Sequence, residues 1–258
     1  MIRDKLIAVG EWGSAVGEAA YWLVPAPLRS RRGSVPALRV FEQIDRFAIG
    51  ILPLLVLVLA CVGMILALQL AAILELLGAV EFLPDIVGVA MVREMAPLLV
   101  GVVLSGALGA SIASEIGALK ITGELGAHES PALSAAALLL APRLIAIAIA
   151  APLVTAFGFA VGIAGGLAIS EGVLGMEIGQ CLTRTADALG LEDLILGLAK
   201  GEVFGIAVVS IAWHAGSRAD GGPGGVGRAA TAAVVRSIVA VIAADLLLTM
   251  LFYRMGWR

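Results

Sequence analysis

The stretch VREMAPLLVGVVLSGALGASIASEIGALKITGELGAHE, residues 92–129, begins with a charged pair, continues as an apolar run and then becomes polar. A helix of roughly 20 apolar residues crosses a hydrocarbon layer of ~30 Å. Small residues recur at helical spacing in this run and permit close approach of a second helix: Gly101, Ser105, Gly106, Gly109, Ala110 and Ala113. No linker precedes the polar end, so we expect a membrane helix that continues into a charged helical segment.

The composition of the whole chain indicates the same environment. Of its 258 residues, 60% are hydrophobic and 14% are charged, and the mean hydropathy is +1.05. An average soluble domain is roughly 45–50% apolar and about 25% charged. We therefore predict an all-α integral membrane protein that forms one domain over residues 1–258.

Residues 1–24 are predicted to form an amphipathic helix in the membrane interface. Apolar side chains recur there at helical spacing, and Trp12, Tyr21 and Trp22 are suited to the headgroup region. An ordinary helix packed on the rest of the protein is the alternative, because amphipathicity alone does not separate the two. Pro25 and Pro27 end the segment.

Long apolar runs predict about five transmembrane helices within residues 44–254. The runs cover residues 48–74, 86–114, 132–170, 194–217 and 237–253. The third run is longer than one crossing requires, and Pro131, Pro142 and Pro152 predict kinks or a separate short helix before it.

The positions of the cations predict the orientation. Arginines concentrate before the first run and in the connection at residues 216–236, whereas residues 171–193 are mainly acidic. The positive-inside rule then places the N-terminus and residues 115–129 in the cytoplasm and the C-terminus outside. Arg254 and Arg258 do not fit this orientation, because they are cations at the end predicted to lie outside.

Several ionisable residues fall at or near membrane depth, where a charge is costly and usually faces a bundle interior, a cavity or a partner. They are Glu75, Arg93, Glu94, Arg143, Lys200, Glu202 and Asp245. Residues near the ends of a span could instead snorkel or pair for structural reasons alone. The chain has no Walker A phosphate loop and no zinc or serine hydrolase motif, so we expect no cofactor and no catalytic residue of its own.

Three runs carry a family resemblance: REMAPLLVGVVLSGALGASIASEIGALKITGELGAHE, APRLIAIAIAAPLV and KGEVFGIAVVSIAWHAGSRADGGPGGVGRAATAAVVRSIVAVIAADLLLTMLFY. In order and spacing the chain resembles the MlaE (YrbE) family of lipid ABC transporter permeases over residues 47–253. The resemblance implies a homodimer in the bacterial inner membrane that moves phospholipid or a related lipid. It also implies two cytoplasmic P-loop ATPase subunits and a periplasmic MCE-domain protein as partners, and no nucleic acid.

The resemblance further implies a cytoplasmic coupling helix between spans two and three that docks on the ATPase, here residues 115–129. Its candidate coupling residues are Glu115, Lys120, Thr122, Glu124 and Glu129. The chain departs from the family pattern at Ala107, where an arginine is usual, and at Gly123 and Gly126, where acidic residues are usual. Each glycine lowers intrinsic helix propensity by about 1 kcal/mol relative to alanine.

As residues that face the translocated lipid or a partner, the sequence offers Arg93, Glu94, Arg143, Lys200 and Asp245. Arg93 and Glu94 are expected at the outer end of an apolar cavity. Two other functions remain open: an ion-coupled secondary transporter that uses intramembrane carboxylates as proton sites, and a membrane-embedded enzyme of lipid metabolism that uses Glu94, Asp245 and His214.

Overall fold

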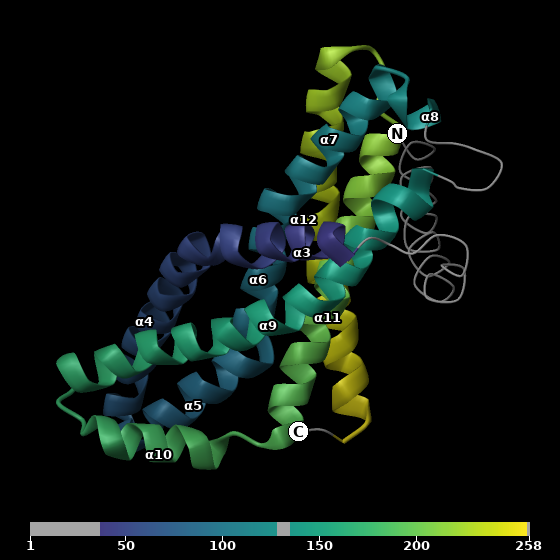
Figure 1. Ribbon diagram of the computed structural model, residues 1–258. Helices are drawn as coiled ribbons and strands as arrows, with labels where there is room; N and C mark the ends of the chain where they lie inside the picture. The colour runs from purple at the N-terminus through teal and green to yellow at the C-terminus, as the bar shows by residue number, and fades with distance from the viewer. Residues whose placement is uncertain (1–36, 128–134, 257–258) are drawn as a thin grey trace, which may run out of the picture.

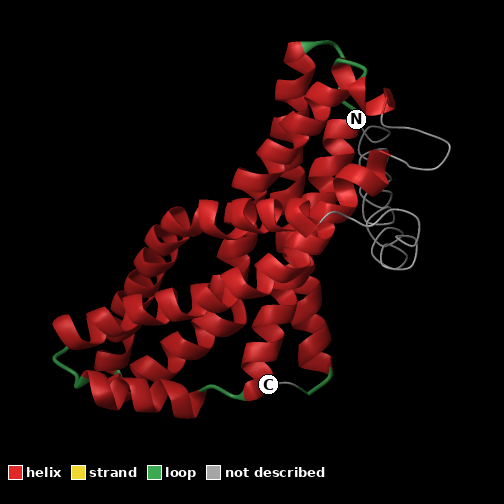
Figure 2. Ribbon diagram, viewed as in Figure 1, coloured by secondary structure: helices red, strands yellow, loops and turns green. Residues whose placement is uncertain are grey.

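The computed structural model describes residues 37–127 and 135–256, and within them every regular element is a helix (Figures 1 and 2). The α-helices are α3 (Ala37–Ala48), α4 (Leu52–Leu76), α5 (Leu83–Ala90), α6 (Ala96–Leu104), α7 (Ala110–Ile121), α8 (Glu124–Ala127), α9 (Ala135–Gly172), α10 (Ile178–Ala188), α11 (Leu191–Ser217) and α12 (Pro223–Arg254). The interfacial helix predicted for residues 1–24 lies outside the described residues.

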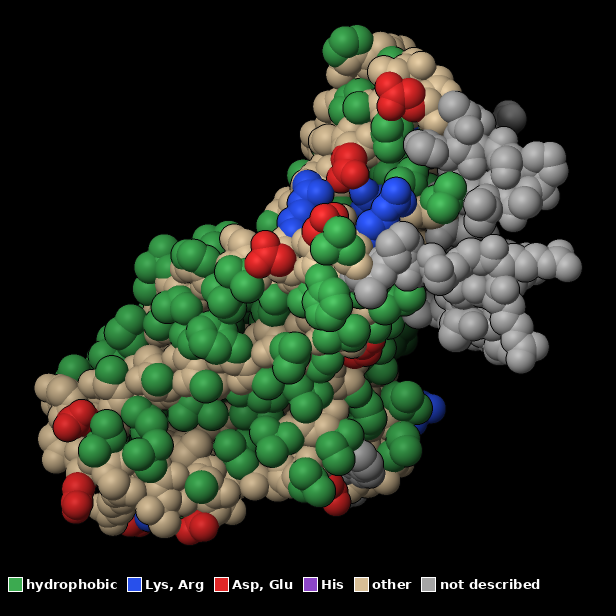
Figure 3. All heavy atoms as spheres, viewed as in Figure 1, with side chains coloured by type: hydrophobic (Ala, Val, Ile, Leu, Met, Phe, Trp, Pro, Cys, Tyr) green, Lys and Arg blue, Asp and Glu red, His purple; other side chains and the backbone are tan. Residues whose placement is uncertain are grey.

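Five helical segments of the described chain are long and apolar enough to cross a membrane, which confirms the predicted number. They are Leu38–Leu76, Val80–Ile121, Leu138–Gly172, Leu191–Ser217 and Pro223–Arg254. On the face shown in Figure 3, hydrophobic side chains cover the body between α3 and α10, and charged side chains gather at the base of the upper projection and near α10. This distribution suits a body surrounded by hydrocarbon and bounded by two polar rims.

The second span is not one regular α-helix. Two π-helical turns, Met91–Met95 and Ser105–Gly109, separate α5, α6 and α7. A π-turn contains an extra residue that interrupts the regular i→i+4 ladder, and such turns occur frequently at functional sites. The charged pair of the opening stretch, Arg93 and Glu94, lies in the first of these turns.

The third span was expected to contain kinks or to follow a separate short helix; in the structure it is one helix, α9, over Ala135–Gly172, and residues 128–134 lie outside the described part of the chain. Helix α9 contains Pro142 and Pro152 in its interior, and Pro131 lies outside the described residues. A proline inside a helix removes one N–H and displaces the carbonyl one turn earlier. Next to Pro142, the Arg143 guanidinium donates a hydrogen bond of 2.9 Å to the Leu139 carbonyl on the same helix.

Helices α4 and α9 approach through glycines. A Cβ atom at Gly63 would lie 2.0 Å from the carbonyl oxygen of Gly162, and one at Gly165 would lie 2.3 Å from that of Ala60. No side chain fits between these backbones, so the small residues set the distance between the first and third spans.

We expect Gly63→Ala to lower the free energy of unfolding by about 1–3 kcal/mol, because the added methyl group forces the two helices apart. Thermal unfolding of the purified protein in detergent measures the change. Gly172→Ala is the matched control, since a Cβ at Gly172 on α9 has no atom within 4 Å. Equal midpoints for the two variants would contradict the close packing described here.

Two amphipathic helices flank the spans and were not predicted as helices. Helix α3 precedes α4 at the beginning of the first segment, Leu38–Leu76, and packs on α9. Helix α10 lies within the acidic connection of residues 171–193 and packs on α5. Arg184 of α10 forms hydrogen bonds of 3.3 and 3.1 Å to the Asp85 carboxylate. The Asp85 hydrogen bond raises the pKa of the Arg184 guanidinium above its ordinary value, so this contact between α10 and the second span stays charged.

One end of the molecule extends beyond α3 as a helical projection, seen at the top of Figure 1. We call this part the arm: α7, α8, the last turns of α11 and the first turns of α12, residues 110–127 and 214–236. Within it α7 packs on both α11 and α12. Helix α12 starts at Pro223, well before the apolar run that begins at residue 237, so the fifth span continues out of the membrane as part of the arm.

Candidate functional site

Lys200 is the centre of a polar cluster inside the bundle. Its side chain is completely buried, and its Nζ lies 2.7 Å from a Glu94 oxygen and 2.9 Å from an Asp245 oxygen. Nζ also donates hydrogen bonds of 3.0 Å to the Arg93 carbonyl and 2.8 Å to the Thr249 hydroxyl. The Thr249 hydroxyl in turn donates to Glu94 at 3.1 Å. One ammonium group thereby joins the second, fourth and fifth spans.

The local sequence explains why a backbone carbonyl is available to Lys200. The N–H of residue 97 would normally donate to the Arg93 carbonyl, but residue 97 is a proline and has no N–H. Arg93 also lies in the π-turn Met91–Met95, where the regular ladder is interrupted. The Lys200 ammonium takes the place of the missing donor, which satisfies a carbonyl that lies in the membrane.

The Arg93 side chain extends the cluster toward the start of α11. Its guanidinium forms an ion pair with Asp193, whose side chain is almost fully buried. The other Asp193 oxygen accepts a hydrogen bond of 2.9 Å from the N–H of Gly190, the N-cap residue of α11. We call Arg93, Glu94, Asp193, Lys200, Asp245 and Thr249 the lysine cluster.

Small residues of α11 allow the lysine cluster to close around Lys200. A Cβ at Gly197 would lie 2.3 Å from the Val92 carbonyl oxygen, and one at Gly201 would lie 2.2 Å from the Thr155 hydroxyl. The backbone of α11 thus lies directly against the π-turn and against α9. Lys200 lies about 14 Å along α11 from Leu191, at roughly 1.5 Å per residue, which is within the hydrocarbon layer if α11 starts at its edge.

The centre of the lysine cluster is buried, and the side chains at its edge, Arg93 and Glu94, are partly exposed. The side chains of Arg93 and Glu94 are 31% and 34% exposed, against 0% for Lys200 and 15% for Asp245. Two cations face three carboxylates, so the cluster carries a negative excess. A charged surface of this kind beside apolar walls can meet a polar headgroup while the walls contact acyl chains.

Arg143 does not belong to the lysine cluster, although the sequence grouped it with Arg93 and Lys200. Its guanidinium lies 2.5 Å from a Glu115 oxygen, and the second Glu115 oxygen lies 3.1 Å from the Arg46 guanidinium. Arg46 also donates a hydrogen bond to the Ser111 hydroxyl. We call Arg46, Ser111, Glu115 and Arg143 the arginine cluster; it joins α3, α7 and α9 where the arm leaves the body.

The candidate coupling residues lie at the end of the second span, and the region after the span is not one helix. Helix α7 ends at Ile121, Gly123 has a φ of +79°, and the four-residue α8 follows. A positive φ favours glycine, so Gly123 allows the chain to turn between the helices. Lys120, Thr122 and Glu124 are exposed, Glu115 belongs to the arginine cluster, and Glu129 lies outside the described residues.

The residues proposed for a membrane-embedded enzyme are not brought together. Glu94 and Asp245 share Lys200, but His214 lies about 21 Å further along α11, at roughly 1.5 Å per residue. His214 is buried in the arm, beside Arg218 and Arg236. Within the described residues, no group of three His, Cys, Asp or Glu side chains is placed to hold a metal ion.

Four members of the two clusters were missed from the sequence: Asp193, Thr249, Arg46 and Ser111. A signal existed for Thr249, which follows Asp245 by four residues and therefore lies on the same face of a helix. Asp193 was read only as part of an acidic outer connection. Its position three residues after Gly190, at the start of a helix, is typical of a capping residue.

The comparisons with known proteins agree on the family. A model of the MlaE permease family matches residues 40–251. A probable ABC transporter permease of Rickettsia typhi is 33% identical over 74% of this chain and 74% of its own length. The intermembrane phospholipid transport system permease protein MlaE of Haemophilus influenzae is 28% identical over 81% of each chain. The chloroplastic protein TRIGALACTOSYLDIACYLGLYCEROL 1 of Arabidopsis thaliana is 29% identical over 88% of this chain and 65% of its own.

The family match covers most of the chain, including three of the five spans completely and nearly all of the first and the fifth. It includes every member of the lysine and arginine clusters, from Arg46 to Thr249. The chain belongs to the MlaE permease family and is a multi-pass membrane permease subunit of the ABC transporter type.

Proposed function

We propose that this protein is the membrane subunit of an ABC transporter that moves phospholipid between the inner membrane and a periplasmic MCE-domain protein. The lysine cluster carries the proposal. In this cluster the partly exposed residues Arg93 and Glu94 lie beside the buried Lys200 ammonium, which connects three spans. The surrounding body is apolar. Apolar walls suit acyl chains because each buried CH₂ group contributes about 0.8 kcal/mol.

The orientation follows from the distribution of charge. The arm carries Arg218, Arg228 and Arg236, which by the positive-inside rule favours the cytoplasm, with the C-terminus in the periplasm. The end with α10 and the acidic connection then faces the periplasm, where an MCE-domain partner would receive or deliver lipid. The lysine cluster lies toward that end, and the exposed tip of the arm suits an ATPase subunit.

ATP hydrolysis on a separate subunit requires a mechanical connection to the bundle. Helix α7 packs on α11 and α12 and continues through π-turns into the second span. Movement of the arm would therefore shift the π-turn that holds Arg93 and Glu94. A switch of this kind needs a second arrangement of the packed helices, favoured by one nucleotide state of the ATPase subunit. Two copies of the permease related by two-fold symmetry would form the cavity between them.

We expect Arg93→Ala and Glu94→Ala each to lower ATP-dependent lipid transfer about tenfold, because the charged edge is lost while the buried lysine remains. Transfer of a fluorescent phospholipid from proteoliposomes of the full complex to its MCE-domain protein measures this. Arg254→Ala is the control, because Arg254 is an exposed cation at the same end of the molecule. Normal lipid transfer by both Arg93→Ala and Glu94→Ala would contradict the assignment of these two residues to the lipid- or partner-facing end of the cavity.

The same lipid-transfer assay distinguishes the proposed ABC transporter from an ion-coupled secondary transporter. Glu94 and Asp245 are carboxylates at membrane depth, which is the feature that a proton-coupled carrier would use. A permease of the ABC type needs ATP and its partner subunit. Transfer driven by a proton gradient without ATP or the ATPase would contradict the proposal and favour the secondary transporter.

A further inference from the structure

Glu202 is an acidic residue at membrane depth that belongs to neither the lysine cluster nor the arginine cluster. It lies on α11 about 16 Å from Leu191 and about 22 Å from Ser217, at roughly 1.5 Å per residue, and thus near the middle of the fourth span. A charge at this depth is costly and usually faces a bundle interior, a cavity or a partner. The proposed transport mechanism does not use this carboxyl group.

Glu202 lies on a different side of α11 from Lys200, because residues two positions apart do not share a helix face. Lys200 is completely buried, whereas Glu202 is partly exposed. One helical turn away on either side of Glu202 are Leu198 and Ile206. Ile195, two turns before Glu202, is 47% exposed. The carboxyl group therefore interrupts an apolar surface of the span.

One oxygen of the Glu202 side chain, Oε2, is buried and accepts no hydrogen bond from any described residue. The Thr155 hydroxyl of α9 lies against the preceding residue, since a Cβ at Gly201 would lie 2.2 Å from Thr155 Oγ1. This hydroxyl is also buried and has no hydrogen-bond partner in the described chain, so it does not donate to Glu202. A buried carboxylate without a donor or a cation is unfavourable.

The charged residues of the elements that pack against α11 are engaged elsewhere or lie at other depths. Those of the lysine and arginine clusters pair with one another. Glu192 and His214 lie toward the two ends of α11 itself. The remaining charged residues of α7, α9 and α12 lie outside the apolar runs of these helices: Lys120, Glu171, Arg228, Arg236 and Arg254.

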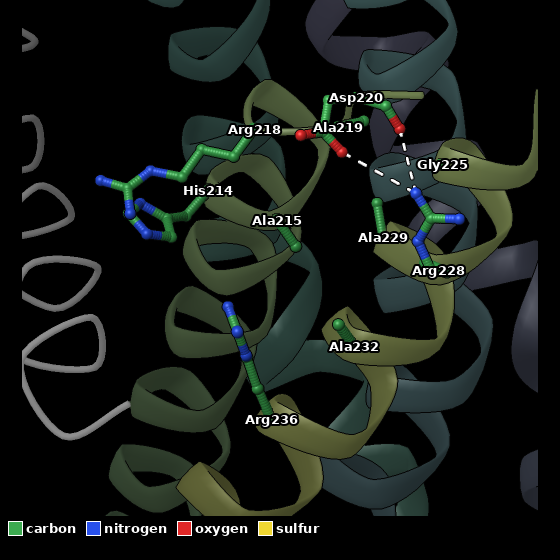
Figure 4. A pocket seen from close by; sticks show the side chains of 10 residues that line it. All are labelled: His214, Ala215, Arg218, Ala219, Asp220, Gly225, Arg228, Ala229, Ala232 and Arg236. Carbon is green, nitrogen blue, oxygen red and sulfur yellow. Dashed lines mark hydrogen bonds and ion pairs between the residues drawn. The ribbon is translucent and has the colours of Figure 1, made fainter. Parts of the chain in front are cut away.

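The cations of α12 are well separated from the depth of Lys200. Figure 4 shows Arg228 and Arg236 in the arm, where Arg228 lies 3.8 Å from an Asp220 oxygen. Arg236 and Arg254 each lie about 13 Å along α12 from Asp245, at roughly 1.5 Å per residue, and Asp245 contacts Lys200. Glu202 is two residues from Lys200, so these cations do not compensate its charge.

Asp245 shows what a carboxylate at this depth requires. It lies 2.9 Å from the Lys200 ammonium, which supplies the opposite charge. Glu202 has no such partner among the described residues. A carboxyl group in apolar surroundings without a cation takes up a proton, because the neutral acid loses much less hydration than the anion.

We propose that Glu202 is a proton-binding site at the contact between α9 and α11: its carboxylate takes a proton from the aqueous phase and lies in the membrane as a neutral carboxylic acid. Proton binding removes the charge from the apolar surface of α11. Release of the proton requires water or a cation at this surface. The site is separate from the lysine cluster and does not rest on the proposed transport function, because the proton binds to the permease itself.

Infrared spectroscopy of the full chain in a maltoside detergent, which has no C=O group of its own, tests the proposal. The C=O stretching band of a protonated carboxyl group is distinct from the bands of a carboxylate. We expect the protonated band at neutral pH in the unchanged protein and the loss of this contribution in Glu202→Gln, which keeps the shape of the side chain. Glu177→Gln removes an exposed acid outside the spans and should leave the protonated band unchanged. If Glu202→Gln removes carboxylate bands instead, the proposal is overturned.

Dicyclohexylcarbodiimide provides a second measurement, because this apolar reagent reacts with protonated carboxyl groups from within the membrane. The carboxyl O–H adds across one C=N bond of the reagent: the oxygen bonds to carbon, the proton goes to nitrogen, and no group leaves. Peptide mass spectrometry should find the adduct on Glu202 and not on Asp245, the matched acid that pairs with Lys200. An adduct on Asp245 but not on Glu202 would overturn the proposal, and the infrared difference decides the case in which neither residue reacts.

Discussion

Lys200→Met is expected to abolish lipid transfer and to lower the free energy of unfolding by about 3–5 kcal/mol. Lys200 is completely buried and lies within 3 Å of carboxylate oxygens of both Glu94 and Asp245. Removal of the ammonium leaves Asp245, whose side chain is 15% exposed, and the partly exposed Glu94 without their shared cation, and an uncompensated buried charge carries a penalty of that size. The loss is a large part of the roughly 5–15 kcal/mol that stabilises a typical domain.

Stability and transfer should respond differently when the carboxylates are also neutralised. The triple variant Lys200→Met, Glu94→Gln, Asp245→Asn has no buried charge at these positions, so we expect most of the stability to return. Lipid transfer should stay absent, because the variant lacks the partly exposed Glu94 carboxylate. Thermal unfolding in detergent and lipid transfer by the reconstituted complex give the two values. An unchanged thermal midpoint for Lys200→Met alone would show that the lysine cluster does not stabilise the bundle.

The sequence predicted the spans because their physical signal is local. A hydrocarbon layer requires roughly 20 consecutive apolar residues, and five such runs are visible without knowledge of any contact. The ends of the helices were predicted less well. Helix α12 starts at Pro223 because Ala229 and Ala233, both buried, pack it against the neighbouring helices of the arm, and this packing does not depend on the length of the apolar run.

Contacts between spans could not be predicted in the same way. The cost of charge at membrane depth identified Glu94, Lys200 and Asp245 individually, but residues 106 positions apart carry no local sign of their contact. For this reason Arg143 was grouped with Lys200, whereas the structure pairs it with Glu115. The short helices α3 and α10 were missed because they lie beside polar connections and contain no long apolar run.

The second large effect is expected at the arginine cluster, where Glu115→Gln should uncouple ATP hydrolysis from transport. Glu115 joins α7 to Arg143 of α9 and to Arg46 of α3, so it connects the arm to the body of the bundle. Without the carboxylate, the Arg143 side chain, which is only 4% exposed, has no acidic partner in the cluster. We expect a loss of about 2 kcal/mol in unfolding free energy, the usual size for a buried polar group that loses its partner.

The functional loss in Glu115→Gln should be larger than the loss of stability. The tip of the arm is unchanged in this variant, so the ATPase subunit should bind and hydrolyse ATP at a normal rate. Lipid transfer should fall about tenfold, because movement of α7 is no longer transmitted to α9. ATP hydrolysis and lipid transfer are measured on the same proteoliposomes, with the exposed acid Glu177 replaced by Gln as the control.

Arg46→Gln provides a graded comparison for Glu115→Gln. The Arg46 and Glu115 side chains are 43% and 39% exposed, and an ion pair that water reaches contributes about 0–1 kcal/mol. We therefore expect only a small change in transfer for Arg46→Gln. If Glu115→Gln were no worse than Arg46→Gln, or if it lowered ATP hydrolysis and transfer equally, the arginine cluster would not transmit movement, and Glu115 would act as a direct contact of the ATPase subunit.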